Sequence, residues 1–275
     1  MTAMLAAYTA VISARYRMLL QYRTAAFAGI LTQLFWGAIK VMVMAAFFQY
    51  STQSQPMNLA QVVTYIWLGQ AFLGMLPWNT DREIEQQVRE GSVVYELLRP
   101  VDVYFYWYCR TIALRTATTT LRSVPIFIVA GLMLPAMGLD AWKLSWPPDL
   151  TALLSFMVSM AGALAVAVGF TNLMHVTLVY ALSGDGINRI MPSVTMIFSG
   201  MVLPLPLFPD WAQTFLNWQP FRGLVDVPFR IYMGHINGAE ILPAILHQFV
   251  WGLIFIAIGR WMMQRSLRRL EVQGG

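Results

Sequence analysis

The sequence predicts an all-α integral membrane protein with a single transmembrane domain over residues 1–275. Of the 275 residues, 58% are hydrophobic and 11% are charged, whereas charged residues make up roughly 25% of an ordinary soluble domain. So few charges could not keep 10 Trp, 16 Phe and 18 Met residues out of water. Apolar runs near the length that crosses a bilayer, about 20 residues, recur along the chain. Lipid is therefore expected to be the main solvent of this protein.

Six mostly apolar segments are predicted to be transmembrane helices. The first is interrupted by Lys40, and the fifth is ended by the prolines that begin at Pro204. The fourth would be roughly 50 Å long, so it is expected to tilt or to protrude into the cytoplasm. Asp102 is placed to cap the helix that leads toward the third span. The six segments are 25–48, 59–78, 123–139, 150–182, 190–203 and 241–258.

The positions of the Lys and Arg residues predict the orientation of these spans. With the N-terminus inside, the cytoplasmic loops hold nearly all of these residues, and Lys143, Arg222 and Arg230 fall outside. This is a strong positive-inside pattern, and it fits an even number of spans. Both termini of this multi-pass protein are therefore expected in the cytoplasm. The net charge of +5 is assigned to attraction for acidic membrane lipid and not to nucleic acid.

Residues 3–22 are predicted to form an amphipathic helix that lies in the cytoplasmic membrane interface. Polar residues recur every four positions, Thr9 and Arg17 among them, while Leu5 and Tyr16 belong to the opposing apolar face. A cleaved signal peptide is rejected, because the basic residues follow the apolar stretch and a signal carries them first. A frayed terminus ahead of the first span is the alternative.

Acidic residues cluster in the predicted cytoplasmic loop 79–102, between the second and third spans. Thr80 and Glu83 have the spacing of a capping box that begins a helix. Glu85 and Arg89 stand four residues apart and can pair, and Gly91 is suited to end the helix. Such a helix is too polar for the bilayer and too short to be stable alone, so it is expected to dock on another protein. A purely structural surface loop is the alternative.

This loop carries a specific family resemblance. Ile84, Gly91 and the Leu-Leu-Arg-Pro run 97–100 are similar to the same loop in permease subunits of type 2 ABC (ATP-binding cassette) exporters, in the branch with paired permeases. The resemblance is specific over 21–131 and includes, at 203–235, re-entrant outer helices between spans five and six. It implies that the polar helix is a coupling helix that contacts an ATPase subunit. The residues of that contact would be Thr80, Asp81, Arg82, Glu83, Ile84, Glu85, Val88, Arg89, Glu90 and Gly91.

The resemblance also implies partners and a location. The chain would be a permease in the bacterial plasma (inner) membrane, with two copies of an ABC ATPase subunit and a second permease, the same or a related chain. No Gly-x-x-x-x-Gly-Lys-Ser/Thr phosphate loop occurs in the sequence, so ATP hydrolysis, with its ATP and Mg, is expected on the separate ATPase subunit. The lone Cys109 excludes a disulfide framework, and no catalytic, cofactor-binding or metal-ligating residue is expected in this chain.

The expected function is ATP-driven export of an amphiphilic or lipid-like substrate. Apolar, aromatic-rich spans suit a drug, a natural product, a lipid or a lipid-linked glycan better than an ion. A membrane scaffold that docks a cytoplasmic partner is one alternative. Half of a secondary transporter is another, although such carriers usually hold a titratable acid in a span, and every Asp and Glu here lies in a loop or at a membrane boundary.

Single residues in or near the spans are candidates for the transport pathway. Lys40 and His175 could line it, because charged and titratable groups inside a membrane are costly, and Lys40 could attract an anionic head group. Alternatively, Lys40 extends to the outer surface or pairs at a subunit seam, and His175 is a hydrogen-bonded packing residue. Trp211, Trp218 and Phe221 on the outer element could form an exit gate, or belong to an aromatic belt at the interface.

Two further sets of residues are assigned roles in packing and topology. Ala161, Ala165 and Gly169 form a row of small residues on the fourth span, which lets another helix approach closely. Arg110 and Arg115 precede the third span on the cytoplasmic side. With Arg122 and with Arg265, Arg268 and Arg269 near the end of the chain, they could hold anionic lipid or recruit an acidic substrate head group, although the positive-inside rule accounts for them as well.

Overall fold

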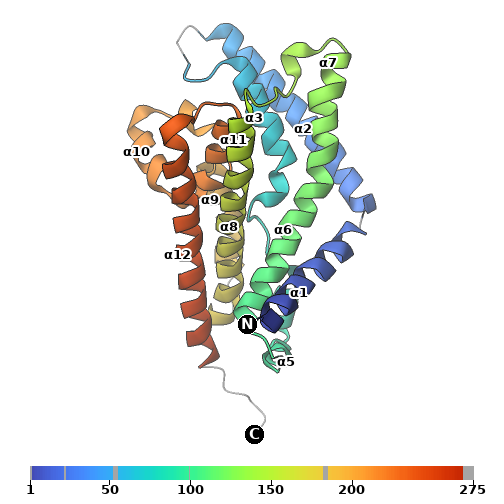
Figure 1. The fold of residues 1–275 in the computed structure, drawn as a ribbon, viewed down its shortest axis with the longest axis vertical. Coiled ribbons are helices and arrows are strands. Elements are labelled where there is room, and N and C mark those ends of the chain that lie inside the picture. Colours follow the sequence, from blue (N-terminus) through green and yellow to red (C-terminus); the bar gives the residue numbers. More distant parts are fainter. Residues whose placement is uncertain (1, 22, 52–54, 99, 182–184, 269–275) are drawn as a thin grey trace.

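The computed structural model describes the chain except for residues 1, 22, 52–54, 99, 182–184 and 269–275. Within the described residues every regular element is a helix and no strand occurs, so the all-helical prediction is confirmed. The long helices stand side by side in an elongated bundle, with the short helices α10 and α11 gathered near its upper end (Figure 1).

Four helices within the described residues are long and apolar enough to cross a membrane: Phe27–Tyr50, Val103–Ala136, Leu150–Val179 and Gly238–Leu267. They correspond to the first, third, fourth and sixth predicted spans, whereas the segments predicted as the second and fifth spans form shorter helices. The helices are α1 (Thr2–Leu20), α2 (Arg23–Tyr50), α3 (Leu59–Ala71), α4 (Arg82–Arg89), α5 (Val94–Leu97), α6 (Val103–Ile128), α7 (Leu134–Ala136), α8 (Leu150–Ala181), α9 (Asp185–Phe198), α10 (Asp210–Trp218), α11 (Asp226–Tyr232) and α12 (Ile241–Leu267).

The segment predicted as the second span is not one continuous helix. α3 ends at Ala71 after 13 residues, and a single 3-10 turn, Leu73–Met75, follows it. At Gly74 an added methyl group would lie 3.0 Å from the Thr118 Oγ1 atom of α6. The 3-10 turn and α6 therefore approach this closely because residue 74 is glycine. Glycine has low helix propensity, and Pro77 follows, so the helix ends here and the chain continues in irregular form toward α4.

α6 begins well before the third span that the sequence predicted at 123–139. Its first residue is Val103, and the Asp102 carboxylate caps it by accepting the N–H of Phe105 at 3.1 Å, as expected. The helix passes through Pro125 and widens into a π-helical turn over Val129–Met133 before α7. The prediction began too late because the arginines in the first half of α6 resemble a loop in sequence, whereas the structure buries two of them against polar partners.

α8 and α12 pack closely through small residues. A methyl group at Gly252 would lie 3.1 Å from the Ala165 Cβ atom, and one at Gly169 would lie 3.3 Å from the Gly252 carbonyl oxygen. The packing role of Ala165 and Gly169 is confirmed. Ala161 is exposed instead, and the neighbouring Gly162 takes the contact with α12, where its missing Cβ makes room for Gln248.

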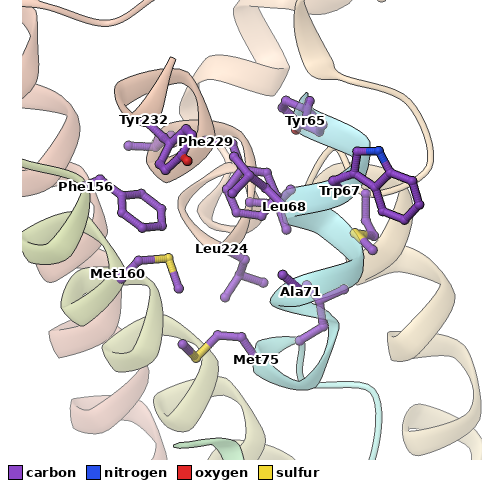
Figure 2. Packing of buried hydrophobic residues seen from close by; sticks show 14 of the residues in the cluster. Tyr65, Trp67, Leu68, Ala71, Met75, Phe156, Met160, Leu224, Phe229 and Tyr232 are labelled. Atoms are coloured by element: carbon purple, nitrogen blue, oxygen red, sulfur yellow. The ribbon is translucent and has the colours of Figure 1, made fainter. Parts of the chain in front are cut away.

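The outer element at 203–235 forms a compact group of short helices against the upper half of the bundle. Its aromatic residues enter the main hydrophobic core between α3 and α8 (Figure 2). The Phe229 ring meets the Tyr65 ring of α3 edge to face with centroids 5.3 Å apart, and Tyr232 meets Phe156 of α8 at 5.1 Å. This packing fixes α11 between two long helices.

The helix predicted as the fifth span at 190–203 lies five residues earlier, as the 14-residue helix α9. α9 ends at Phe198, and Gly200 follows with φ +89°, a left-handed backbone conformation that favours glycine. An added methyl group at Gly200 would also overlap the Tyr65 hydroxyl. The prediction extended the helix to 203 because its apolar run continues, whereas the turn and the contact with α3 end it.

The predicted N-terminal helix at 3–22 is present as α1. It packs obliquely against the lower half of α6, where the rings of Tyr8 and Phe105 meet at 6.4 Å (Figure 1). Its place in a membrane interface stays a prediction.

Candidate functional site

The predicted docking helix is α4, which lies at the end of the bundle where α6 begins and α8 ends. The Ile84 side chain anchors it, fully buried in a cluster with Trp107 of α6, Val176 of α8 and Met263 of α12. Burying a side chain of this size contributes about 1.5–3 kcal/mol. This apolar anchor explains why a helix of 8 residues, too short to be stable alone, is ordered here.

The cap of α4 differs from the one predicted. Asp81, not Thr80, is the N-cap residue, and its Oδ1 atom accepts the N–H of Glu83 at 3.0 Å. The Thr80 hydroxyl instead donates to Glu85 Oε2 at 3.1 Å. The capping box was wrong by one residue because both Thr80 and Asp81 suit the cap, and the ionic partners of Asp81 select it.

The end of α4 agrees with the sequence. Gly91 has φ +72°, and its N–H donates to the Val88 carbonyl at 3.3 Å. Glu85 and Arg89 form the expected i,i+4 pair, with Arg89 Nη2 and Glu85 Oε1 3.0 Å apart. Both features depend on neighbours in sequence, which is why they could be predicted.

Two arginines from other helices hold the start of α4. Arg110 of α6 lies 3.0 Å from an Asp81 oxygen and 2.7 Å from a Glu83 oxygen. Arg15 of α1 lies 3.2 Å from Asp81 and 2.7 Å from Glu83. Because the side chains of Arg110 and Asp81 are each 4% exposed, removing one partner would leave a buried charge and cost about 3–5 kcal/mol.

The charge balance at this network fixes the ionisation of the capping residue. Burial raises the pKa of the Asp81 carboxyl, but the facing charges of Arg110 and Arg15 outweigh burial, so its pKa lies below its ordinary value. Asp81 is therefore an anion at neutral pH. It accepts from both arginines while it caps α4.

The segment after α4 is tied to the same arginine. Glu96 of α5 is buried, and one of its oxygens accepts the Trp107 indole N–H. Its other oxygen lies 3.7 Å from Arg110. Arg110 thus faces carboxylates both before and after the helix, so α4 and α5 are fixed to α6 as one unit.

A second arginine of α6 holds the chain that leads into α4. Arg115 has 2% of its surface exposed and donates to the Leu76 carbonyl at 2.7 Å. It also donates to the Asn79 main-chain carbonyl at 2.5 Å and to the Asn79 side-chain Oδ1 atom at 2.9 Å. It also donates to the Thr171 hydroxyl of α8 at 3.1 Å. The irregular backbone between α3 and α4 is satisfied in this way without being helical.

His175 lies in this network and not in a cavity. Its Nε2 atom accepts the main-chain N–H of Asp81 at 2.8 Å, and the side chain is fully buried against Trp107. The Nε2 atom is therefore unprotonated, with the proton on Nδ1. This is the hydrogen-bonded packing role that the sequence left open.

The outward face of α4 and α5 is free of these internal contacts. Arg82, Gln86 and Glu90 are exposed, and so are the apolar side chains of Tyr95 and Leu98. Two charged side chains and one amide therefore lie on the surface near two large exposed side chains, Tyr95 and Leu98. We call these five residues the docking face.

The other candidate pathway residue, Lys40, and the candidate gate residues lie outside the α4 network. Lys40 of α2 donates to the Met201 carbonyl at 3.2 Å and borders an apolar cavity. Trp211 and Trp218 are 84% and 76% exposed. Phe221 instead packs edge to face on Phe170 of α8 at 5.1 Å, so the three predicted gate aromatics do not form one cluster.

Sequence reasoning missed the residues that position α4. Arg15, Arg110, Arg115 and Glu96 were counted only as topology signals or loop charges. One signal could have identified two of them: Arg110 and Arg115 lie in the first half of the helix that follows the acidic loop, which suggests that the two segments pair. The missing information was the direction in which α6 presents these side chains.

Comparison with known proteins gives one match. A family described as ABC-2 family transporter protein has a model that matches residues 34–274, a range that includes α4, the arginines of α6 and His175. No curated protein matches the chain significantly.

Proposed function

Because the chain belongs to the ABC-2 family of transporter proteins, as a membrane permease, we propose that it exports an amphiphilic or lipid-like substrate with energy from ATP. The observation that carries the proposal is the placement of α4. Its outward face is exposed, while burial of Ile84 and the ion pairs of Asp81 and Glu83 fix its inner face to the bundle. The apolar helices and the apolar cavity beside Lys40 support an amphiphilic substrate.

Family membership implies association with an ABC ATPase subunit. We propose that this subunit binds at the docking face. We propose also that the ATPase subunit, and not this chain, binds ATP with Mg and hydrolyses the ATP. Two ATPase subunits and a second permease, the same or a related chain, complete the transporter. One docking face on each permease then serves one ATPase.

Six membrane crossings are proposed, with four of them made by the long helices. The run from α3 to Asp81 supports a further crossing, because Thr64 meets Ser145 before the start of α8 while Asp81 meets His175 near its end. That run therefore extends along most of α8. α9 and the outer element supply the remaining crossing. Both termini lie on the cytoplasmic side of a bacterial inner membrane.

The contacts of α4 define how force passes into the bundle. ATP binding brings the two ATPase subunits together and pushes on the docking face. The push passes from Asp81 and Glu83 to α6 through Arg110 and to α1 through Arg15. It passes to α8 through His175. Three helices of the permease therefore move with α4, and the spans tilt so that the pathway opens outward.

The test is co-purification of an ATPase with the full-length chain from native membranes in mild detergent, with ATP hydrolysis measured on the eluate. The triple variant Arg82→Glu, Gln86→Arg and Glu90→Arg reverses two exposed charges and adds a third, so it changes the docking face and leaves the inner network intact. The matched control reverses Arg265 and Arg268, which are exposed at the same end of the bundle on or after α12.

The proposal expects the docking-face variant to lose the ATPase, or to retain it with hydrolysis no longer dependent on the permease, while the control keeps both. Thermal unfolding of each purified variant separates loss of docking from loss of fold. An intact chain that recovers no ATPase would favour a scaffold or half of a secondary transporter.

A further inference from the structure

A cavity of about 220 Å³ lies between α2, α3 and the segment that follows α9. Lys40 is the one charged residue among those that line it. The apolar lining includes Trp36, Val43, Ile66, Met201, Val202 and Pro204. The docking network described above uses none of these residues.

The Lys40 ammonium has unused bonding capacity. It carries three N–H donors, and one of them is used by the Met201 carbonyl at 3.2 Å. Within the described part of the chain, no carboxylate forms an ion pair with it. A positive charge among apolar walls at the depth of a membrane-spanning helix is costly unless an anion or further acceptors meet it.

Tyr65 also lines the cavity, but its hydroxyl does not open onto it. The side chain is 2% exposed, and the hydroxyl is covered and has no hydrogen-bond partner. The oxygen lies against Gly200, where any side chain would overlap it. The Lys40 ammonium is therefore the charged donor of this cavity, and its remaining N–H groups suit a group with more than one acceptor oxygen, such as a phosphate or a carboxylate.

The cavity opens at the side of the bundle. Trp36, Val43 and Val202 line it and are each more than half exposed. Its volume of about 220 Å³ is below the roughly 300–1,000 Å³ of pockets that enclose a whole drug-sized ligand. Only part of a molecule can enter, so the rest must lie outside the bundle, where a membrane protein meets lipid chains.

We propose that this cavity binds an anionic amphiphile, with its phosphate or carboxylate on Lys40 and its hydrocarbon chain passing Trp36 into the bilayer. The anion neutralises the ammonium, and the apolar walls receive the first carbons of the chain. The proposal deepens the proposed function and rests on it for the claim that such a molecule is moved. Binding itself is measured without the ATPase.

The two lysines of this chain allow a direct test, because Lys40 and Lys143 are distinguished by mass spectrometry of their peptides. The full-length chain in nanodiscs of phosphatidylcholine is treated with a membrane-permeant amine-reactive ester. Labelling of each lysine is then measured with and without dodecyl phosphate. At a concentration of ten times its Kd, dodecyl phosphate is expected to lower Lys40 labelling about tenfold. Labelling of the exposed Lys143 is the internal control and is expected not to change.

Matched probes identify what is recognised. Dodecanol has the chain without the charge, and inorganic phosphate has the charge without the chain, so neither is expected to protect Lys40. Nanodiscs that contain phosphatidylglycerol separate two sources of the ligand. Protection without added dodecyl phosphate assigns the site to a resident bilayer lipid, and protection only with it assigns the site to a free amphiphile. Equal protection by dodecanol, or none by either anion, would overturn the proposal.

Variants give a second measurement that does not depend on labelling. Lys40→Met keeps the length and apolar volume of the side chain and is expected to abolish dodecyl phosphate binding in titration calorimetry. Tyr65→Phe, which removes a covered hydroxyl, and Lys143→Met are both expected to leave it unchanged. Binding that survives Lys40→Met contradicts the proposal. If binding is present but the docking-face variants leave the ATPase unaffected, the proposed function fails and this inference stands.

Discussion

The Nε2 atom of His175 accepts the main-chain N–H of Asp81 at 2.8 Å, and so joins the last third of α8 to the N-cap residue of the docking helix. The donor would otherwise be unsatisfied, because Asp81 precedes the helix and its own side chain is committed to Glu83 and to two arginines. The bond spans 94 positions in sequence. It makes the position of α4 a property of the bundle and not of the loop.

Replacing His175 by Phe keeps the ring volume and removes the acceptor. The buried N–H of Asp81 would then lack a partner, so the free energy of unfolding should fall by about 1–3 kcal/mol. Hydrogen exchange of the amides of α4 should become faster, whereas exchange in the upper half of α12 should not change. Unchanged exchange in α4 would mean that the bond does not hold the helix.

Arg110→Gln should be more damaging than the loss of an exposed arginine. It leaves Asp81 and Glu96 buried with fewer positive charges to face, and breaking such a pair costs about 3–5 kcal/mol. The expected result is a large loss of thermal stability together with loss of permease-dependent ATP hydrolysis. Arg265→Gln, at an exposed position of α12, is the control and should change stability by less than about 0.5 kcal/mol.

The network should lose stability in acid through Asp81. Because its pKa in the folded protein is lowered, the folded state binds fewer protons there than the unfolded state does. The contribution is fully present above the unfolded value of about 3.9 and is lost as the pH falls through the lower folded-state pKa. The protection of the α4 amides from hydrogen exchange should therefore stay constant between about pH 8 and about pH 5. It should decline below about pH 4.

Asp81→Asn should be less stable at neutral pH and should lack this acid-dependent part. The comparison is thermal unfolding of the two proteins in the same nanodiscs across the pH range. Asp140→Asn, which changes an exposed carboxylate paired with Lys143, serves as the control and should follow the wild-type curve. Parallel curves for the wild type and Asp81→Asn would contradict the assignment.

Gly252→Val should separate α8 from α12. Even the first added carbon would lie 3.1 Å from the Ala165 Cβ atom, and overpacking of this kind costs about 1–3 kcal/mol. Thermal unfolding in detergent should show the loss. Ala257→Val, on an exposed face of the same helix, adds the same kind of side chain and should be nearly neutral.

The sequence by itself determined the features that depend on composition or on near neighbours. Low charge and long apolar runs predict membrane helices, because hydrocarbon accepts backbone only when its hydrogen bonds are closed within the helix. The pair Glu85–Arg89 and the turn at Gly91 follow from spacings of a few residues, and both are confirmed. The resemblance that began at Ile84 and Gly91 agrees with the family match over 34–274.

Only the tertiary structure decided which polar groups meet across long stretches of chain. Thr80 and Asp81 are equally good caps by local chemistry, and Arg15 and Arg110, from two other helices, select Asp81. The end of α3 at Ala71 likewise depends on the approach of α6 to Gly74. The physical reason is that spacing along a chain fixes neighbours within about one helical turn. The burial that gives Arg110 and Lys40 their partners exists only after the helices have packed.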